Sequence, residues 1–163
     1  MKDLFVKILS TFFFVGYNPV LPGTSTSFVN VIIIFILFKY LNNLYFFIIP
    51  TAALLFTVIG FPVSSAAEKI FGKKDPGKVT IDEAAGTYIS YSFLRFEQME
   101  FPALVFIGIF LIFRALDMAK PWLIYSVQKL PGGSGIMMDD IIAGAAANIL
   151  IRCIYLISFG VLV

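Results

Sequence analysis

Residues 44–67 read LYFFIIPTAALLFTVIGFPVSSAA, a run of 24 residues without a charged side chain. A helix needs about 20 apolar residues to cross the hydrocarbon layer of a membrane, so this run is long enough to span it. Pro50 and Pro62 are expected to kink the helix, because proline lacks the backbone N–H that a helix interior requires. Residues 139–162 form a second run of sufficient length. The two runs predict a membrane-embedded helical protein.

The composition of the whole chain agrees with that prediction. Hydrophobic residues make up 60% of the chain and charged residues 13%, against about 45–50% and about 25% in an average soluble domain. The mean hydropathy is +0.94. A length of 163 residues fits one domain, residues 1–163. The small net charge of +2 gives no reason to expect a nucleic-acid partner.

Five helices are expected in an all-α, compact, membrane-embedded bundle. Their predicted ranges are residues 28–40, 44–67, 82–95, 102–117 and 139–162. A shorter amphipathic helix over residues 2–15 precedes them. The first, third and fourth of the five are shorter than a full membrane crossing and would have to extend, tilt or thin the bilayer locally. The basic and then apolar start has no small-residue cleavage site after it, so no cleavable signal peptide is expected.

The basic residues predict how the bundle is oriented. If the loops around Pro22, Asp75, Lys120 and Gly133 share one side, nine basic residues lie on that side and only Lys39 and Arg95 on the other. The nine are Lys2, Lys7, Lys69, Lys73, Lys74, Lys78, Arg114, Lys120 and Lys129. Such a bias marks the cytoplasmic side of a membrane. The C-terminus would then lie on the outer side.

More than half of the acidic residues lie in three short clusters between the apolar segments. The chain has ten acidic residues, and six of them are Asp75, Asp82, Glu83, Asp117, Asp139 and Asp140. A carboxylate beside an apolar phase is costly unless it is paired, hydrogen-bonded or bound to a cation. Oxygen ligands without histidine or thiol ligands suit a hard cation such as Mg²⁺.

The first cluster is KKDPGKVTIDEAAG, residues 73–86. Its Pro-Gly pair indicates a turn, after which Asp82 and Glu83 open a helix. Gly86, one turn later, would let another backbone approach closely. An equally simple interpretation is that the two acids cap the helix and complement its dipole.

The second cluster is FRALDMAKPW, residues 113–122. Arg114, Asp117 and Lys120 are each three residues apart, so neighbouring side chains can meet on a helix. Arg114 and Lys120 could bind a phosphate while Asp117 binds a metal, since the arginine fork suits phosphate oxygens. Alternatively, the basic residues only complement the end of the helix dipole. Trp122 is expected to anchor the chain at the membrane interface.

The third cluster is PGGSGIMMDDIIAG, residues 131–144. A glycine-rich turn feeds Asp139 and Asp140 at the expected start of a long helix, and adjacent like charges repel unless a cation joins them. Ala143, Gly144 and Ala147 form a small face that permits close helix packing. The alternative is a flexible linker followed by a helix cap.

The early loop, residues 18–27, is rich in hydroxyl groups that could contact a phosphate. Thr24 and Ser27 belong to this loop, although such residues before an apolar run most often cap a helix.

Residue types and motifs that are missing from the chain exclude several kinds of catalytic site. The chain has no histidine and a single cysteine, Cys153, which excludes serine–histidine triads, histidine-dependent lipid phosphatases and a disulfide framework. No Walker phosphate loop is present. Carboxylate and metal chemistry at a membrane surface remains.

Four blocks in this order resemble the phosphatidylglycerophosphatase A family: LPGT with Ser27, DPGKVTIDEAAG, FRALDMAKPW and GGSGIMMDDIIAG. Thr26 stands where the family tends to have glycine and Leu116 where it usually has an aromatic residue, and neither change removes a charge. The resemblance implies an Mg²⁺-dependent, multi-pass enzyme of the bacterial inner (cytoplasmic) membrane whose active site faces the cytoplasm. Its substrate would be phosphatidylglycerophosphate, converted to phosphatidylglycerol and phosphate in phospholipid biosynthesis, and its surroundings the lipid bilayer.

The expected roles follow from the resemblance and from the clusters together. The predicted catalytic residues are Asp75, Asp82, Asp117 and Asp140, with Asp75 as an acid or base. The predicted phosphate-binding residues are Arg114, Lys120, Thr24 and Ser27. The predicted Mg²⁺ ligands are Asp82, Glu83, Asp139 and Asp140.

Several alternatives stay open at this point. The attacking group could be a metal-bound water or a carboxylate. The substrate could be another lipid phosphate, such as phosphatidic acid. The acids could instead line an ion path in a cation-binding membrane protein, or serve a purely structural scaffold. The number of metal ions and the oligomeric state are also open.

Overall fold

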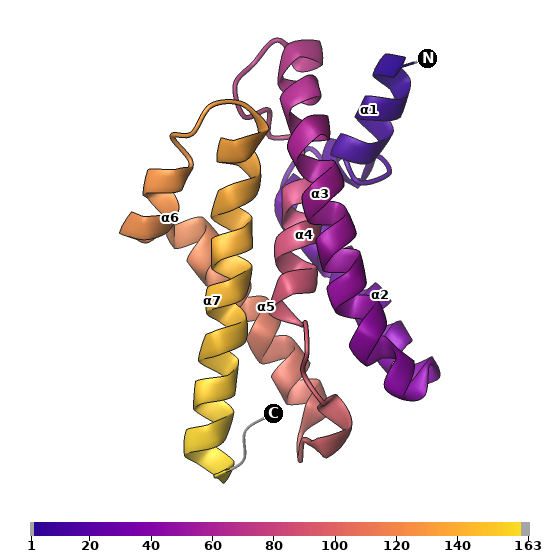
Figure 1. Ribbon diagram of the computed structural model, residues 1–163, viewed down its shortest axis with the longest axis vertical. Helices are drawn as coiled ribbons and strands as arrows, with labels where there is room; N and C mark the ends of the chain where they lie inside the picture. Colours follow the sequence, from indigo (N-terminus) through magenta and orange to yellow (C-terminus); the bar gives the residue numbers. More distant parts are fainter. Residues whose placement is uncertain (1, 161–163) are drawn as a thin grey trace.

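The computed structural model describes residues 2–160, which form helices joined by turns and loops and contain no strand. The helices are α1 (Lys2–Ser10), α2 (Pro22–Tyr40), α3 (Tyr45–Phe71), α4 (Ile81–Ser90), α5 (Pro102–Ala119), α6 (Trp122–Val127) and α7 (Gly133–Phe159). Three short 3₁₀ turns, Val15–Tyr17, Asn42–Leu44 and Phe96–Gln98, join them. The predicted all-α bundle is therefore confirmed, with α2, α3, α4, α5 and α7 as its five main helices (Figure 1).

Four of these helical segments are long and apolar enough to cross a membrane. They are Pro22–Tyr40, Asn42–Phe71, Pro102–Ala119 and Gly133–Phe159. Large apolar side chains such as Phe47, Leu104 and Ile157 are exposed on them. A soluble protein would have to hide such a surface, whereas lipid covers it at no cost. The molecule is a membrane protein.

The fifth bundle helix, α4, is too short to cross a membrane and corrects the predicted range of residues 82–95. It ends at Ser90, where hydroxyl groups bond to carbonyl groups of its last turns. The Ser90 hydroxyl donates to the carbonyl oxygen of Thr87 at 2.7 Å, and that of Ser92 donates to the carbonyl oxygen of Tyr88 at 2.7 Å. Instead of spanning, α4 is enclosed by α2, α3, α5 and α7.

Two other predicted boundaries were wrong in ways that concern the site. Helix α2 begins at Pro22 rather than at residue 28, with the proline in the first turn, where its missing N–H costs nothing. Helix α7 begins at Gly133 rather than at residue 139. The glycine-rich stretch is therefore the first turn of α7, and Asp139 and Asp140 lie inside the helix rather than at its start.

The other helix boundaries lie closer to the predicted ones. Helix α1 ends at Ser10 rather than at residue 15, because Phe12, Phe13 and Phe14 have positive φ angles. Helix α3 continues through Pro50 and Pro62 to Phe71, beyond the predicted end at residue 67. The short helix α6 was not predicted. The last residues of the predicted range 139–162 lie outside the described part of the chain, and α7 ends at Phe159.

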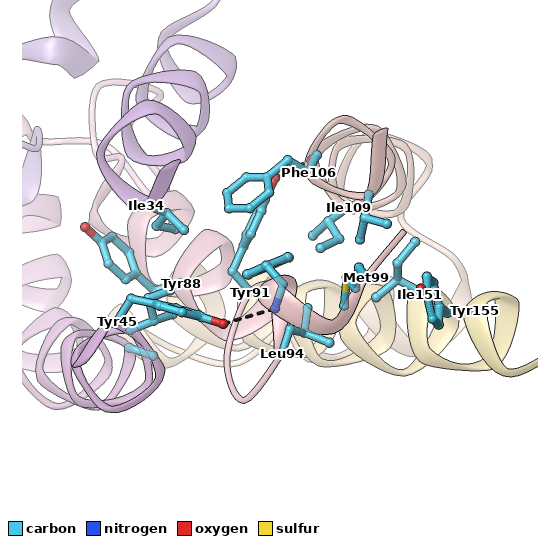
Figure 2. Close-up of a cluster of buried hydrophobic side chains, with 14 residues drawn as sticks. Ile34, Tyr45, Tyr88, Tyr91, Leu94, Met99, Phe106, Ile109, Ile151 and Tyr155 are labelled. Carbon is cyan, nitrogen blue, oxygen red and sulfur yellow. Dashed lines mark hydrogen bonds between the residues drawn. The ribbon is translucent and has the colours of Figure 1, made fainter. Parts of the chain in front are cut away.

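The non-helical chain between α4 and α5 is held by side chains from neighbouring helices. The Tyr45 hydroxyl accepts a hydrogen bond from the backbone N–H of Phe96 at 3.0 Å within the main apolar core (Figure 2). The Asn148 amide on α7 donates to the carbonyl oxygens of Ser90 and Ser92 at 3.0 and 2.9 Å. Irregular backbone inside an apolar bundle needs such partners, since no water is there to replace them. These bonds fix the C-terminal end of α4.

Glycines bring α4 and α7 into direct backbone contact, which is the close packing that the small residues predicted, with a partner that the sequence did not identify. A Cβ atom on Gly86 would lie 2.6 Å from the carbonyl oxygen of Asp140, and one on Gly144 would collide with the carbonyl oxygen of Gly86. Only glycine permits this approach. The crossing sets the first turn of α4, with Asp82 and Glu83, beside Asp139 and Asp140 of α7.

The connecting loops separate onto two ends of the bundle. Figure 1 shows helix α1, the loop between α3 and α4, and the loop between α6 and α7 at one end. The turn between α2 and α3 and the chain between α4 and α5 lie at the other. The loops that contain Asp75 and Gly132 therefore share one end, which matches the predicted grouping. Which end faces the cytoplasm stays a prediction.

Candidate active site

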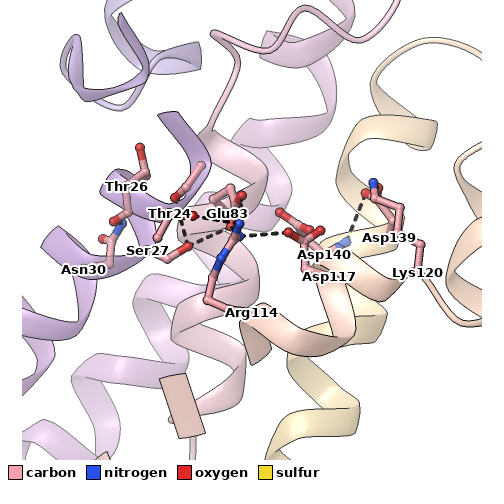
Figure 3. Close-up of polar contacts among 11 residues, drawn as sticks. Thr24, Thr26, Ser27, Asn30, Glu83, Arg114, Asp117, Lys120, Asp139 and Asp140 are labelled. Carbon is pink, nitrogen blue, oxygen red and sulfur yellow. Dashed lines mark hydrogen bonds and ion pairs between the residues drawn. The ribbon is translucent and has the colours of Figure 1, made fainter. Parts of the chain in front are cut away.

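Three helices bring carboxylates together near the end of the bundle that contains α1. Glu83 comes from the first turn of α4, Asp117 from the last turn of α5, and Asp140 from α7. Each offers a carboxylate oxygen, and these three oxygens lie within 4.8 Å of one another. All three residues are buried. We call Glu83, Asp117 and Asp140 the acidic triad (Figure 3).

Arg114 joins two members of the triad. Its Nη1 donates to both carboxylate oxygens of Glu83, at 2.7 and 2.6 Å, and to Oδ2 of Asp117 at 2.8 Å. Its Nη2 donates to the hydroxyl of Thr24 on α2 at 3.0 Å. The expected neighbour pair of Arg114 and Asp117, three residues apart on one helix, is therefore formed. The guanidinium holds the ends of α2, α4 and α5 together (Figure 3).

The start of α2 supplies a second bond to Glu83. The Ser27 hydroxyl donates to Oε2 of Glu83 at 2.7 Å, within a fully buried environment. Gly23, one turn earlier, leaves room for the same carboxylate, since a Cβ atom there would collide with it. Thr24 and Ser27 were predicted to bind phosphate. In this structure, their hydroxyl groups bond to Arg114 and Glu83.

Lys120 forms an ion pair with Asp139 at the edge of the triad. The Nζ of Lys120 donates to Oδ2 of Asp139 at 2.7 Å, and Oδ1 of Asp139 accepts the backbone N–H of Asp140 at 3.0 Å. Burial alone would lower the pKa of Lys120, but its hydrogen bond to Asp139 and the nearby negative charges raise it above the ordinary value. Lys120 is therefore charged at neutral pH.

Asp82 completes the acidic group and lacks a partner. Part of the residue is exposed, but its Oδ1 atom is buried and has no hydrogen-bond partner in the part of the chain that the structure describes. Burial raises the pKa of Asp82 well above its ordinary range, and the charges of Glu83 and Asp139 add to the effect. A bound cation would reverse both contributions.

The charges in the site do not balance. We call Asp82, Glu83, Asp117, Asp139 and Asp140 the carboxylate cluster, and it faces two basic side chains, Arg114 and Lys120. The site as a whole, the cluster together with Arg114 and Lys120, therefore has three more acidic than basic groups. Oxygen ligands, an orphaned buried carboxylate atom and an excess of acidic over basic groups all fit a divalent cation. The acidic triad could bind a metal ion.

Asp75 is the one predicted site residue that lies apart. It sits on the exposed loop between α3 and α4 with a positive φ of 47°. Its backbone N–H donates to Glu68 at 3.0 Å, and its carboxylate accepts a long bond of 3.4 Å from Gln128. The charge of Asp75 adds to those that raise the pKa of Asp82. The acid–base role of Asp75 stays a prediction.

Sequence reasoning missed some residues that shape the site. Glu68 and Gln128 hold the Asp75 loop, and neither carries a pattern that would have revealed this. Asn30 is fully buried on α2, one turn beyond Thr26, to whose carbonyl oxygen it donates at 2.8 Å. An asparagine inside the apolar run FVNVIIIF was a visible signal.

Comparison with known proteins found a matching family and several relatives. Residues 8–155 match the family described as phosphatidylglycerophosphatase A. A relative from Bacteroides thetaiotaomicron, named a putative phosphatidylinositol-3-phosphatase, is 33% identical over 146 residues, covering 88% of this chain and 89% of its own. The phosphatidylglycerophosphatase A of Escherichia coli K12 is 32% identical over 138 residues, which cover 84% of this chain and 76% of the relative. The phosphatidylglycerophosphatase A of Haemophilus influenzae is 29% identical over 150 residues, which cover 91% of this chain and 88% of the relative. No solved structure matches the chain.

The match extends over most of the chain and contains the whole carboxylate cluster, Arg114 and Lys120. The chain belongs to the phosphatidylglycerophosphatase A family.

Proposed function

We propose that this protein hydrolyses the terminal phosphate of phosphatidylglycerophosphate, giving phosphatidylglycerol and inorganic phosphate, with Mg²⁺ as its cofactor. Its family makes it a phosphoric monoester hydrolase. The observation that carries the proposal is the buried acidic triad bridged by Arg114 inside a membrane-embedded bundle. A lipid phosphate presents its charged headgroup at the membrane surface, and the positions of Glu83 in the first turn of α4 and Asp117 in the last turn of α5 support a site there.

The carboxylate cluster provides the ligands for Mg²⁺ in this proposal. Glu83, Asp117 and Asp140 already converge, and Asp82 offers an unpartnered oxygen from the same turn as Glu83. Asp139, which the sequence also placed among the ligands, is tied to Lys120. When bound, Mg²⁺ would neutralise charge on the phosphate and on the leaving oxygen and would lower the pKa of a bound water.

The basic side chains would orient the phosphate. Lys120 is partly exposed and charged, so it can turn a donor toward an entering anion. Arg114 already uses Nη1 for Glu83 and Asp117 and Nη2 for Thr24. Exchange of the Thr24 hydroxyl for a phosphate oxygen would keep Glu83 and Asp117 in place. The attacking group, a water or a carboxylate, stays open in this proposal.

The proposed location is the cytoplasmic face of a bacterial inner membrane. The lysine-bearing loops before α4 and before α7 share the end of the bundle near the carboxylate cluster (Figure 1). Basic loops remain on the cytoplasmic side during insertion. The phosphate would then reach the site without crossing hydrocarbon, while the acyl chains stay in the bilayer.

Other lipid phosphates are the main alternatives. The name of the Bacteroides relative favours a phosphorylated phosphatidylinositol as a second candidate. A cation-binding membrane protein would place its acids along a path through the bilayer. Glu83 and Asp117 instead lie in the first turn of α4 and the last turn of α5.

A substrate panel tests the proposed substrate. Purified protein in mixed micelles with saturating Mg²⁺ would receive phosphatidylglycerophosphate, phosphatidic acid or phosphatidylinositol 3-phosphate, all with the same acyl chains. We expect kcat/KM for phosphatidylglycerophosphate to exceed the other two by at least about tenfold, since differential contacts to a polar headgroup discriminate strongly. Protein carrying Glu83→Gln, purified identically, controls for a contaminating phosphatase. A preference for either other lipid would contradict the proposed substrate.

A further inference from the structure

A groove runs along the surface of the bundle between α2 and α5. Its volume is about 500 Å³. The walls are entirely apolar and include Phe28, Val31 and Phe35 from α2 and Ala103, Ile107 and Phe110 from α5. The two helices run in opposite directions here, so Phe28 packs against Phe110 with ring centres 6.2 Å apart, and Phe35 packs against Phe106 at 5.5 Å.

The groove continues into a second hollow that reaches Thr24, the hydrogen-bond partner of Arg114. This hollow has a volume of about 360 Å³ and shares Phe28 and Phe110 with the groove. It also contains polar groups of Asn18, Thr24 and Ser25. The Thr24 hydroxyl accepts the hydrogen bond from Arg114 at 3.0 Å. An apolar groove, a partly polar hollow and the charged site therefore follow one another along α2.

We propose that the α2–α5 groove holds an acyl chain of the substrate lipid while its phosphate lies at Arg114 and the acidic triad. The inference rests on the proposed function and names the site that recognises the lipid portion of that substrate. The polar hollow between them would hold the glycerol and phosphodiester portion, next to Asn18 and Ser25, which are joined by a hydrogen bond of 2.6 Å.

Continuity with the site separates this groove from the other apolar grooves of the bundle. A groove between α5 and α7 is lined by Leu104, Gly108 and Ile154 among others, and one between α3 and α7 by Leu54 and Ile149 among others. The first of these shares Ile107 with the α2–α5 groove, but neither shares a residue with the polar hollow. Bystander lipids can cover all three, but only the α2–α5 groove leads to the site.

The dimensions suit one lipid chain. From Thr24 to Phe35 the axis of α2 rises about 16 Å, at about 1.5 Å per residue. Ala103, in the first turn of α5, lies at the far end from Arg114. A long acyl chain would reach Ala103, whereas a six-carbon chain would end near Phe28 and Phe110.

The groove would orient the substrate rather than strengthen its binding through the hydrophobic effect. An acyl chain is surrounded by apolar groups in the bilayer too, so its transfer into the groove gains little from the hydrophobic effect. A fixed chain instead holds the headgroup in register with the triad, and a displacement of about 1 Å in such a site can cost about a hundredfold in rate. The expected signature is a change in catalytic efficiency that depends on chain length.

The test fills the far end of the groove. Ala103→Trp is compared with Leu104→Trp, which places the same side chain on the α5–α7 groove. Each protein is assayed on phosphatidylglycerophosphate with dioleoyl or dihexanoyl chains. We expect Ala103→Trp to lower kcat/KM for the dioleoyl lipid by about tenfold and to leave the dihexanoyl lipid unchanged. Leu104→Trp should alter neither. An unchanged dioleoyl rate in Ala103→Trp, or an equal loss for both lipids, would overturn the inference.

A second measurement tests whether the acyl chain lies in the α2–α5 groove and does not require phosphate release. A phosphatidylglycerophosphate analogue with a photoreactive group near the end of one acyl chain is irradiated with the wild-type protein in nanodiscs, and the labelled peptides are identified. Labelling at Ala103 or Phe35, which line the α2–α5 groove and not the α5–α7 groove, supports the proposal even if phosphate release fails, provided that excess unlabelled phosphatidylglycerophosphate suppresses it and phosphatidylcholine does not. Labelling of every lipid-facing helix, or labelling that phosphatidylcholine suppresses equally, would show that only bystander lipid lies there.

Discussion

Asp140→Asn is expected to lower phosphate release from phosphatidylglycerophosphate by about a thousandfold or more. Asp140 is almost fully buried at 2% exposure and is a member of the acidic triad. An amide keeps the shape of the side chain but has neither the charge nor the second acceptor oxygen that a hard cation prefers. Loss of metal-based charge stabilisation costs several kcal/mol, and each 1.4 kcal/mol is about tenfold in rate.

The fold should survive this substitution. Glu83, Asp117, Asp82 and Asp139 all place negative charge near Asp140, so a neutral side chain relieves repulsion when no metal is bound. We expect the thermal midpoint of Asp140→Asn in detergent with chelator to equal or exceed that of the wild type. Asp3→Asn makes the same chemical change at an exposed position on α1 and should leave activity intact. Full activity in folded Asp140→Asn would refute the site assignment.

Arg114→Gln is expected to remove activity and most of the stability margin together. Arg114 holds two buried carboxylates, Glu83 and Asp117, and its side chain is only 12% exposed. Removal of one partner from a buried ion pair leaves uncompensated charge and costs about 3–5 kcal/mol. Chemical unfolding in mild detergent, followed by circular dichroism, measures the loss.

Two comparisons separate the ion pair from general damage. Arg95→Gln breaks the exposed pair of Arg95 and Glu97, whose atoms are 3.8 Å apart, and should cost less than about 1 kcal/mol. The double variant Arg114→Gln with Glu83→Gln removes both partners, so it should recover part of the lost stability without recovering activity. If Arg114→Gln were as stable as Arg95→Gln, the bridging role of Arg114 would be wrong.

Periodicity and length in the sequence predicted the bundle because apolar runs of helix length can only be satisfied in a membrane as helices. The run over residues 44–67 became the core of α3, and the small residues Gly86 and Gly144 marked the crossing of α4 and α7. The start of α7 was misplaced because glycine usually indicates a turn, whereas Gly133 and Gly135 here start a helix packed against neighbouring backbone. Tertiary contact outweighed local propensity.

The sequence indicated which acids could gather, but not which basic side chains they would pair with. Clustered acids in an apolar chain identified Asp82, Glu83, Asp117 and Asp140, because such groups are costly without a purpose. Sequence spacing alone could not show that Arg114 would bridge from α5 to Glu83 on α4, or that Lys120 would pair with Asp139. Those contacts depend on how α4, α5 and α7 cross, and the α4–α7 crossing is set by the close backbone approach at Gly86 and Gly144.

The most direct test of the central claim is phosphate release from phosphatidylglycerophosphate by the purified wild-type protein, with Mg²⁺ and with chelator. The carboxylate cluster together with Arg114 and Lys120 has three more acidic than basic groups, so the account predicts release with Mg²⁺, loss in chelator and recovery when Mg²⁺ is restored. Equal release in Mg²⁺ and in chelator, or no release by protein shown to be folded, would contradict it.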